Sequence, residues 1–145
     1  HLEKWAAAHK LSHARVSTLP SGAESDVILV DGVGKLGDLY ALADVAFIGG
    51  GFQSAGLHSV LEPAAYGVPV LFGPRHEKSR DAATIIAEDA GGAVTDFSAI
   101  AARLEALLTR PDTRAAEGAR ARGIVEKGRG ASERSLTLVN GLLGV

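Results

Sequence analysis

Residues 31–74, DGVGKLGDLYALADVAFIGGGFQSAGLHSVLEPAAYGVPVLFGP, contain two short apolar runs that each end in glycine. Val45–Ile48 (VAFI) is followed by three glycines, and Val68–Phe72 (VPVLF) is followed by Gly73-Pro74. Continuous apolar runs of this length are typical of strands buried on both faces of a parallel sheet. Between them, His58–Tyr66 has helical spacing and is stopped by Gly67. The stretch therefore predicts a strand, a helix and a second strand.

The same alternation continues outward in both directions. Further strands are predicted at Ala14–Thr18, Val27–Val30 and Ala93–Thr95, and further helices at Lys35–Ala43, Lys78–Ala90, Ser98–Leu108, Thr113–Lys127 and Ser132–Leu143. Strands that alternate with helices of about ten residues indicate parallel crossovers, hence an α/β fold with an open parallel sheet flanked by helices. Because no repeat or linker interrupts the pattern, we expect residues 1–145 to form one domain. The long helical C-terminus suits a last helix that packs on a partner.

Composition excludes several classes of protein. The 145 residues carry a formal net charge of -2, so no basic surplus exists for a nucleic-acid partner. The absence of cysteine excludes disulfides, thiolate metal sites and a cysteine nucleophile. The longest apolar runs fall far short of the roughly 20 residues of a membrane-spanning helix.

The start of the sequence indicates a fragment. The chain begins at His1, inside the helix-like stretch HLEKWAAAHK, and contains no methionine. Since a complete reading frame ordinarily begins with Met, we expect sequence to be missing upstream.

The glycine-rich stretch after Ile48, GGGFQSAGLHS, is a candidate binding loop. Ligands of open parallel sheets bind beyond the carboxyl ends of the strands, and N–H groups at a following helix start bind phosphate. A flexible turn without a ligand is the alternative. The glycines do not fit the dinucleotide motif G-x-G-x-x-G, because Ser54 occupies the sixth position counted from Gly49. They do not fit the phosphate loop of ATPases either, because Leu57-His58 stand where Lys-Ser/Thr is required.

Three side chains near the strand ends have suitable chemistry. Glu62 precedes Pro63 near the start of a helix, where its carboxylate can accept hydrogen bonds from a ribose diol or simply favour the helix N-terminus. After the next strand, Arg75 can pair with a phosphate or carboxylate, and His76 can bind a sugar. For Arg75, an ordinary surface position is the alternative.

With these residues in view, the stretch Asp31–Pro74 resembles the C-terminal half of bacterial Kdo transferases. Members of that family resemble one another around a Gly-Gly-His-Asn-x-Leu-Glu-Pro core and a Gly-Val-Pro-Val-x-x-Gly-Pro strand, which this chain carries as Gly56–Pro63 and Gly67–Pro74. Leu57 and Ser59 depart from the glycine and asparagine of the core, and Lys35 stands where a glutamate is usual. The loop from Arg75 to Ser79 also differs from the usual Thr-Glu-Asn-Phe-like run.

The resemblance implies the GT-B fold, two Rossmann-like domains facing a cleft, of which this chain is the C-terminal domain. It implies transfer of 3-deoxy-D-manno-oct-2-ulosonic acid (Kdo) from CMP-Kdo to a lipid A precursor, in lipopolysaccharide biosynthesis at the cytoplasmic face of the bacterial inner membrane. The acceptor, the catalytic glutamate and the peripheral membrane surface would belong to an N-terminal domain, so no catalytic residue is expected in this chain and the chain alone is expected to be inactive. No metal or cofactor is implied.

The resemblance also assigns a nucleotide-sugar site. Glu62 would bind the cytidine ribose, the backbone around Gly56–Ser59 would hold the phosphate, and Gly73-Pro74-Arg75 would line the nucleotide. The full set of expected binding residues is Gly50, Gly51, Gly56, Leu57, His58, Ser59, Glu62, Gly73, Pro74 and Arg75.

Two alternatives remain open at this point. Another GT-B glycosyltransferase that uses a UDP- or GDP-sugar would share the Glu-Pro helix and the following strand. A non-catalytic interaction domain could be built on the same Rossmann-like fold. A dinucleotide-dependent oxidoreductase is disfavoured by the glycine spacing.

Overall fold

A computed structural model describes residues 1–20, 24–54 and 56–144. Ala55, which falls in the predicted glycine-rich loop, lies outside the described residues. The chain forms two compact units, His1–Leu39 and Tyr40–Val145, and the short helix α2 (Leu36–Tyr40) spans their boundary.

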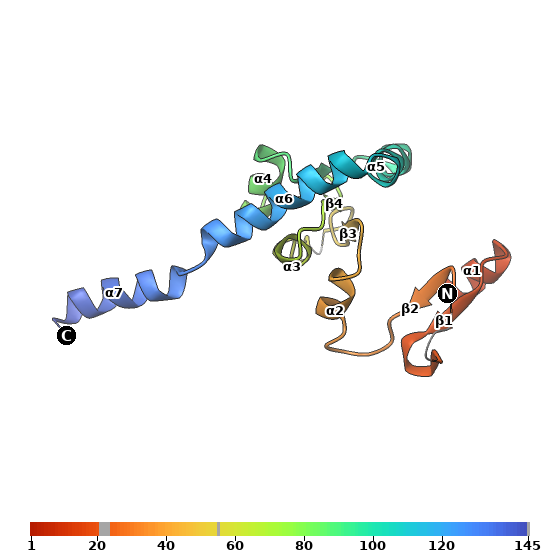
Figure 1. Ribbon diagram of the computed structural model, residues 1–145, viewed down its shortest axis with the longest axis horizontal. Helices are drawn as coiled ribbons and strands as arrows, with labels where there is room; N and C mark the ends of the chain where they lie inside the picture. Colours follow the sequence, from red (N-terminus) through yellow and green to blue (C-terminus); the bar gives the residue numbers. More distant parts are fainter. Residues whose placement is uncertain (21–23, 55, 145) are drawn as a thin grey trace. The chain divides into compact units, whose positions relative to one another are not determined.

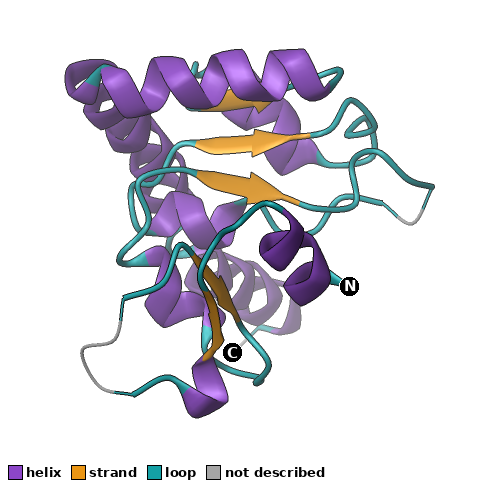
Figure 2. Ribbon diagram, turned by 90° about the vertical axis from the view of Figure 1, so that its right-hand side faces the viewer, coloured by secondary structure: helices purple, strands orange, loops and turns teal. Residues whose placement is uncertain are grey.

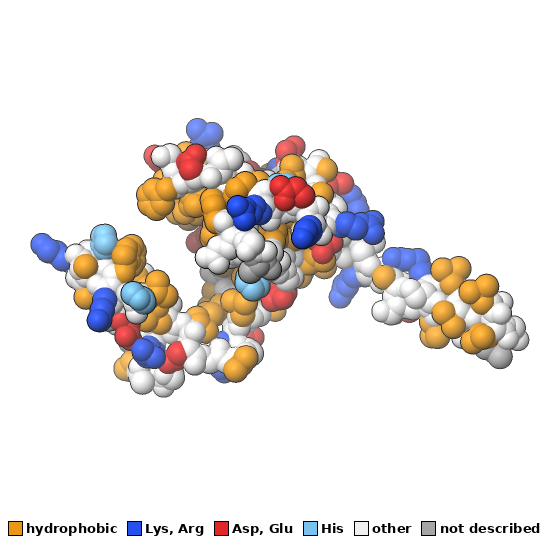
Figure 3. Space-filling view, turned by 180° about the vertical axis from the view of Figure 1, so that it is seen from behind, with side chains coloured by type: hydrophobic (Ala, Val, Ile, Leu, Met, Phe, Trp, Pro, Cys, Tyr) orange, Lys and Arg blue, Asp and Glu red, His pale blue; other side chains and the backbone are white. Residues whose placement is uncertain are grey.

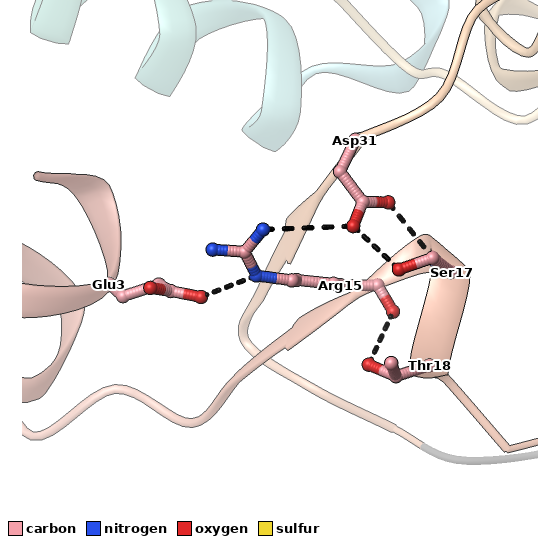
Figure 4. A network of polar contacts seen from close by, with 5 residues as sticks. All are labelled: Glu3, Arg15, Ser17, Thr18 and Asp31. Atoms are coloured by element: carbon pink, nitrogen blue, oxygen red, sulfur yellow. Dashed lines mark hydrogen bonds and ion pairs between the residues drawn. The ribbon is translucent and has the colours of Figure 1, made fainter.

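The first unit is built on a pair of parallel strands. Helix α1 (Leu2–Ala8) precedes β1 (His13–Arg15), which leads into the 3-10 helix η1 (Val16–Thr18), and β2 (Val27–Leu29) pairs with β1 in parallel. The prediction of a strand over Ala14–Thr18 is wrong in its second half. The reason is visible in Figure 4: the backbone N–H and the Oγ of Ser17 donate to the Asp31 carboxylate at 3.1 and 2.6 Å, which draws the chain out of the strand.

Arg15 links the elements of this unit. Its Nε donates to Glu3 on α1 at 2.7 Å, and its other end lies 3.8 Å from Asp31 at the end of β2 (Figure 4). The hydrogen bond from Arg15 lowers the pKa of Glu3, and the hydrogen bonds from Ser17 lower the pKa of Asp31. These contacts are exposed, so they position the chain more than they stabilise it.

The second unit contains a three-stranded parallel sheet. Strands β3 (Ala46–Ile48), β4 (Val70–Phe72) and β5 (Gly91–Ala93) lie in the order β3-β4-β5 and run side by side (Figure 2). The three side chains of β4 are fully buried, as predicted for a strand covered on both faces. Burial of such apolar side chains contributes roughly 1.5–3 kcal/mol each.

Helices cover this sheet and connect its strands. Helix α3 (Leu61–Ala65) joins β3 to β4, and α4 (Arg80–Ala87) joins β4 to β5. Helices α5 (Phe97–Thr109) and α6 (Pro111–Gly128) follow β5, and α6 packs against α3, α4 and α5 (Figure 1). The core cluster combines Ile48, Val60, Phe72, Ile85 and Ala121 with smaller neighbours, so that sheet and helices share one apolar interior.

Several predicted elements are displaced. Helix α3 begins at Leu61 instead of His58, because the His58 N–H donates to the Gly49 carbonyl at 3.3 Å and holds that segment at the end of β3. Strand β5 comprises Gly91–Ala93 instead of Ala93–Thr95. Gly91 pairs with Val70 of β4 in parallel, and it passes so close that a Cβ would lie 2.8 Å from the Val70 nitrogen, so only glycine fits there.

Strand β3 departs from the prediction of burial on both faces. Ala46 and Ile48 are buried, but the side chain of Phe47 between them is 44% exposed. Phe47 stacks on Phe52 of the following loop, with ring centroids 6.4 Å apart.

Helix α7 (Ala131–Leu143) has no buried residue in the described chain. Its apolar side chains, Leu136, Leu138, Val139, Leu142 and Leu143, are all exposed. Figure 3 shows hydrophobic surface along this helix. None of the described helices combines the length and hydropathy that crossing a membrane requires.

Candidate functional site

A cavity of about 540 Å³ lies in the second unit beside the ends of two neighbouring strands. Because β3 and β4 are parallel, their carboxyl ends meet at one edge of the sheet, where open α/β sheets bind ligands. One wall comes from the loop after β3 and the other from the loop after β4. The lining residues are Gln53, Ser54, Gly56, Leu57, Arg75, His76, Glu77, Lys78 and Ser79.

Two glycines bring these loops together. The Arg75 N–H donates to the Gly51 carbonyl at 2.9 Å, across the two strand ends. A Cβ added to Gly51 would lie 2.6 Å from the Gly73 nitrogen, and a Cβ on Gly73 would lie 2.7 Å from the Phe52 ring. Real Cβ atoms do not approach so closely, so both positions require glycine. These glycines therefore shape the cavity by backbone packing and do not themselves line it.

Leu57 fits the loop despite its departure from the glycine of the family motif. The positive φ of this segment, 95°, belongs to Gly56. Leu57 does not adopt the left-handed conformation, and its side chain packs against the core of the unit while also lining the cavity. The substitution therefore anchors the loop without backbone strain.

The second wall contains groups that the sequence reasoning used only in part. His76 packs edge-on against Phe72 with ring centroids 5.4 Å apart, and its buried Nδ1 has no hydrogen-bond partner among the described residues. Buried polar atoms in folded proteins usually have a partner, so Nδ1 is an unsatisfied polar atom beside this wall. The Oγ of Ser79 accepts from the Ala82 N–H at 3.2 Å and caps α4.

The lining of the cavity contains more positively than negatively charged side chains. Arg75 and Lys78 form no ion pair among the described residues, whereas Arg15, Arg103, Arg114 and Arg122 all do. Glu77 lines the same wall and is likewise unpaired there. The cavity thus offers two free cations and one carboxylate to a ligand. No group of three or more His, Asp or Glu side chains with metal-binding geometry occurs in the described part of the chain.

The expected binding residues are only partly brought together. Gly56, Leu57 and Arg75 line the cavity. Gly50, Gly51, Gly73 and Pro74 lie in the two loops behind the lining, and His58 and Ser59 are exposed between the cavity and α3.

Glu62 lies in the first turn of α3, as predicted, and is exposed. It is close enough to Tyr40 that its charge, after burial, helps to raise the pKa of that phenol. It does not line the cavity.

Gln53, Ser54, Glu77 and Lys78 were missed by the sequence analysis. The only sequence feature that pointed to these four residues was their position, since each follows a predicted strand that ends in glycine. Polarity in a loop is too common to single such residues out.

The parallel sheet and the cavity at its carboxyl edge define an open α/β domain of the Rossmann-like class. In structure, the chain matches the C-terminal CMP-Kdo binding domain of WaaA from Acinetobacter baumannii with a TM-score of 0.75 and 28% identity, covering 86% of this chain and 66% of that one. In sequence, it is 36% identical over 116 residues to the 3-deoxy-D-manno-octulosonic acid transferase of Chlamydophila psittaci, which is 79% of this chain. The corresponding transferases of Aquifex aeolicus and Bordetella pertussis are 39% and 35% identical over 59% and 85% of this chain.

The chain is therefore a relative of the Kdo transferases and has the fold of the C-terminal half of a GT-B enzyme. The predicted fold class and family resemblance are both confirmed. The chain spans 27%, 25% and 29% of the lengths of these three curated relatives, between a quarter and a third of each. No family model matches the sequence.

Proposed function

We propose that residues 1–145 form the donor-binding domain of a Kdo transferase, which holds CMP-Kdo while Kdo is moved to a lipid A precursor. The observation that carries the proposal is the cavity between the loops after β3 and β4, in a chain similar to Kdo transferases over most of its length. In this proposal the enzyme works at the cytoplasmic face of the inner membrane, and the acceptor and the catalytic carboxylate belong to sequence beyond this chain.

Within the domain, the cavity takes the phosphate and sugar of the donor. Arg75 suits the phosphate, because a guanidinium can give two parallel hydrogen bonds to phosphate oxygens. Neutralising the phosphate also stabilises the charge that CMP carries away as it leaves. Glu62, exposed in the first turn of α3, is the residue that we assign to the ribose of the donor, because a carboxylate accepts hydrogen bonds from both hydroxyl groups of a diol.

A thermal-shift comparison of CMP, UDP and GDP tests the proposal. We expect CMP to raise the melting temperature of the chain, because a ligand that binds the folded state alone stabilises it in proportion to the logarithm of its concentration. UDP and GDP should have little effect at the same concentration. Stabilisation by UDP alone would assign the chain to a transferase that uses a different nucleotide sugar. If none of the three nucleotides raises the melting temperature, the result would favour a non-catalytic interaction domain.

A further inference from the structure

Arg75 and Lys78 are two cations on one wall of the cavity, where Glu77 supplies a carboxylate. They are three residues apart, on the short connection between β4 and the capped start of α4. Both line the cavity, and neither has an ion-pair partner in the described ranges. Two cations against the one carboxylate of Glu77 leave the lining net positive, which favours an anionic ligand.

The chemistry of the proposed donor supplies two charges side by side. In a nucleotide-activated 2-ulosonic acid, the phosphodiester oxygen and the carboxylate are bonded to the same anomeric carbon. The phosphodiester of CMP-Kdo carries one negative charge, which one cation can neutralise. A second cation a few residues away has an anionic partner when the sugar itself is an acid.

We propose, building on the function above, that Lys78 is a specificity-determining residue that pairs with the carboxylate of the donor sugar, while Arg75 pairs with the phosphodiester. The Arg75 backbone is held at the strand end by its hydrogen bond to Gly51, beside the loop assigned to the nucleotide. Lys78 lies further along the wall, next to α4. The carboxylate of Glu77 and the amide of Gln53 line the same cavity and suit the hydroxyl groups of the sugar.

Isothermal titration of the chain with CMP and with freshly prepared CMP-Kdo tests this assignment. We expect Lys78→Gln to weaken CMP-Kdo binding about tenfold, the loss of one charge-assisted hydrogen bond in an open site, and to change CMP binding less than about twofold. Lys78→Arg should restore most of the affinity for CMP-Kdo. Arg80→Gln is the matched control, because it removes one positive charge two residues away, at the start of α4, from a side chain that does not line the cavity.

The outcomes separate the two proposals. If the unaltered chain binds neither CMP nor CMP-Kdo, both the proposed function and this inference are overturned. If it binds CMP and Lys78→Gln weakens CMP and CMP-Kdo equally, Lys78 serves the phosphate and this inference alone fails. No effect of Lys78→Gln on either ligand also overturns it. UDP-glucose is the third ligand to be titrated, because its diphosphate also carries two adjacent negative charges. If UDP-glucose binds and its binding depends on Lys78, the assignment of Lys78 to a sugar carboxylate is overturned.

Discussion

Gly51 and Gly73 meet backbone to backbone at the carboxyl ends of β3 and β4, and the Arg75 N–H donates to the Gly51 carbonyl at 2.9 Å beside them. This contact sets the separation of the two loops that enclose the cavity. The glycines that looked like a phosphate-binding pattern in the sequence therefore serve first to bring the two walls of the cavity together. The residues that line the cavity follow these glycines in the sequence.

Gly73→Ala should damage both stability and binding. A Cβ at this position would lie 2.6 Å from the Gly51 carbonyl oxygen and 2.7 Å from the Phe52 ring, so the loops must separate. We expect a loss of about 2–3 kcal/mol in the free energy of unfolding, the upper part of the range for an overpacked position, measured by urea denaturation. Gly92→Ala in β5 is the control, because a Cβ there meets nothing within 4 Å. Equal effects of the two variants would contradict the proposed role of the Gly51–Gly73 contact.

Two glycines of α6 should respond in opposite directions to alanine. A Cβ on Gly118 would overlap the carbonyl of Gly67, with the carbonyl carbon 3.0 Å away, so Gly118→Ala should destabilise the second unit by about 2 kcal/mol. Gly123 has open space around its Cβ position, so Gly123→Ala should stabilise the helix by about 0.5–1 kcal/mol. Far-ultraviolet circular dichroism during urea denaturation measures both. A stabilising Gly118→Ala would show that α6 does not pack against the turn after α3.

The ion pair between α5 and α6 should matter more than an exposed one. Arg103 Nη2 donates to both oxygens of Glu117, at 3.0 and 2.8 Å, and Glu117 is only 6% exposed. Arg103→Met should cost about 2 kcal/mol, less than for a fully buried pair because the Arg103 side chain is itself 36% exposed. Arg122→Met breaks the exposed pair with Glu126 on α6 and should cost less than about 0.5 kcal/mol. Thermal unfolding followed by circular dichroism compares them, and similar losses would argue against a buried Glu117.

The first unit should lose stability in acid. Hydrogen bonds from Ser12 and Ser17 lower the pKa of Asp26 and Asp31, respectively, below the ordinary value of 3.8. A carboxyl whose pKa is lower in the folded state contributes stability that is fully present well above 3.8 and is lost as the pH falls through the folded-state pKa. Trp5, the single tryptophan of the chain, lies in this unit and reports its unfolding by fluorescence.

The double variant Asp26→Asn/Asp31→Asn should be less stable at pH 7 and should show a weaker pH dependence below pH 4 than the unaltered chain. Glu24→Gln, in the same unit but outside both hydrogen-bonded pairs, is the control. An unchanged acid transition in the double variant would contradict the role of these carboxyls.

Much of the fold was predictable because it rests on local patterns. The apolar run of β4 predicted a strand buried on both faces, and the long helices α5, α6 and α7 were placed within two residues of their ends. The errors have tertiary causes. Asp31 draws Ser17 out of β1, and the close passage of Gly91 along Val70 makes a strand from residues that look like a helix stop.

The position of the candidate site was more predictable from the sequence than the residues that line it. The position of the cavity follows from two parallel strands that end in glycine, and Arg75 follows from its place after the second strand. Lys78, Gln53 and Ser54 were not predictable, because which polar side chains of a loop reach a cavity depends on how the loop folds back. Leu57 illustrates the same limit, since its fit depends on Gly56 taking the positive φ.

The most direct test of the account is a nuclear magnetic resonance titration of the ¹⁵N-labelled chain with CMP. We predict that the amide signals of Gly56, Leu57 and Arg75 shift in a saturable manner, while those of α5 and of the Arg15–Asp31 network stay in place. Arg75→Gln should weaken the titration about tenfold, as expected for the loss of a charge-assisted phosphate contact. No saturable shift, or shifts confined to residues away from the loops after β3 and β4, would contradict the assignment of this cavity to the nucleotide sugar.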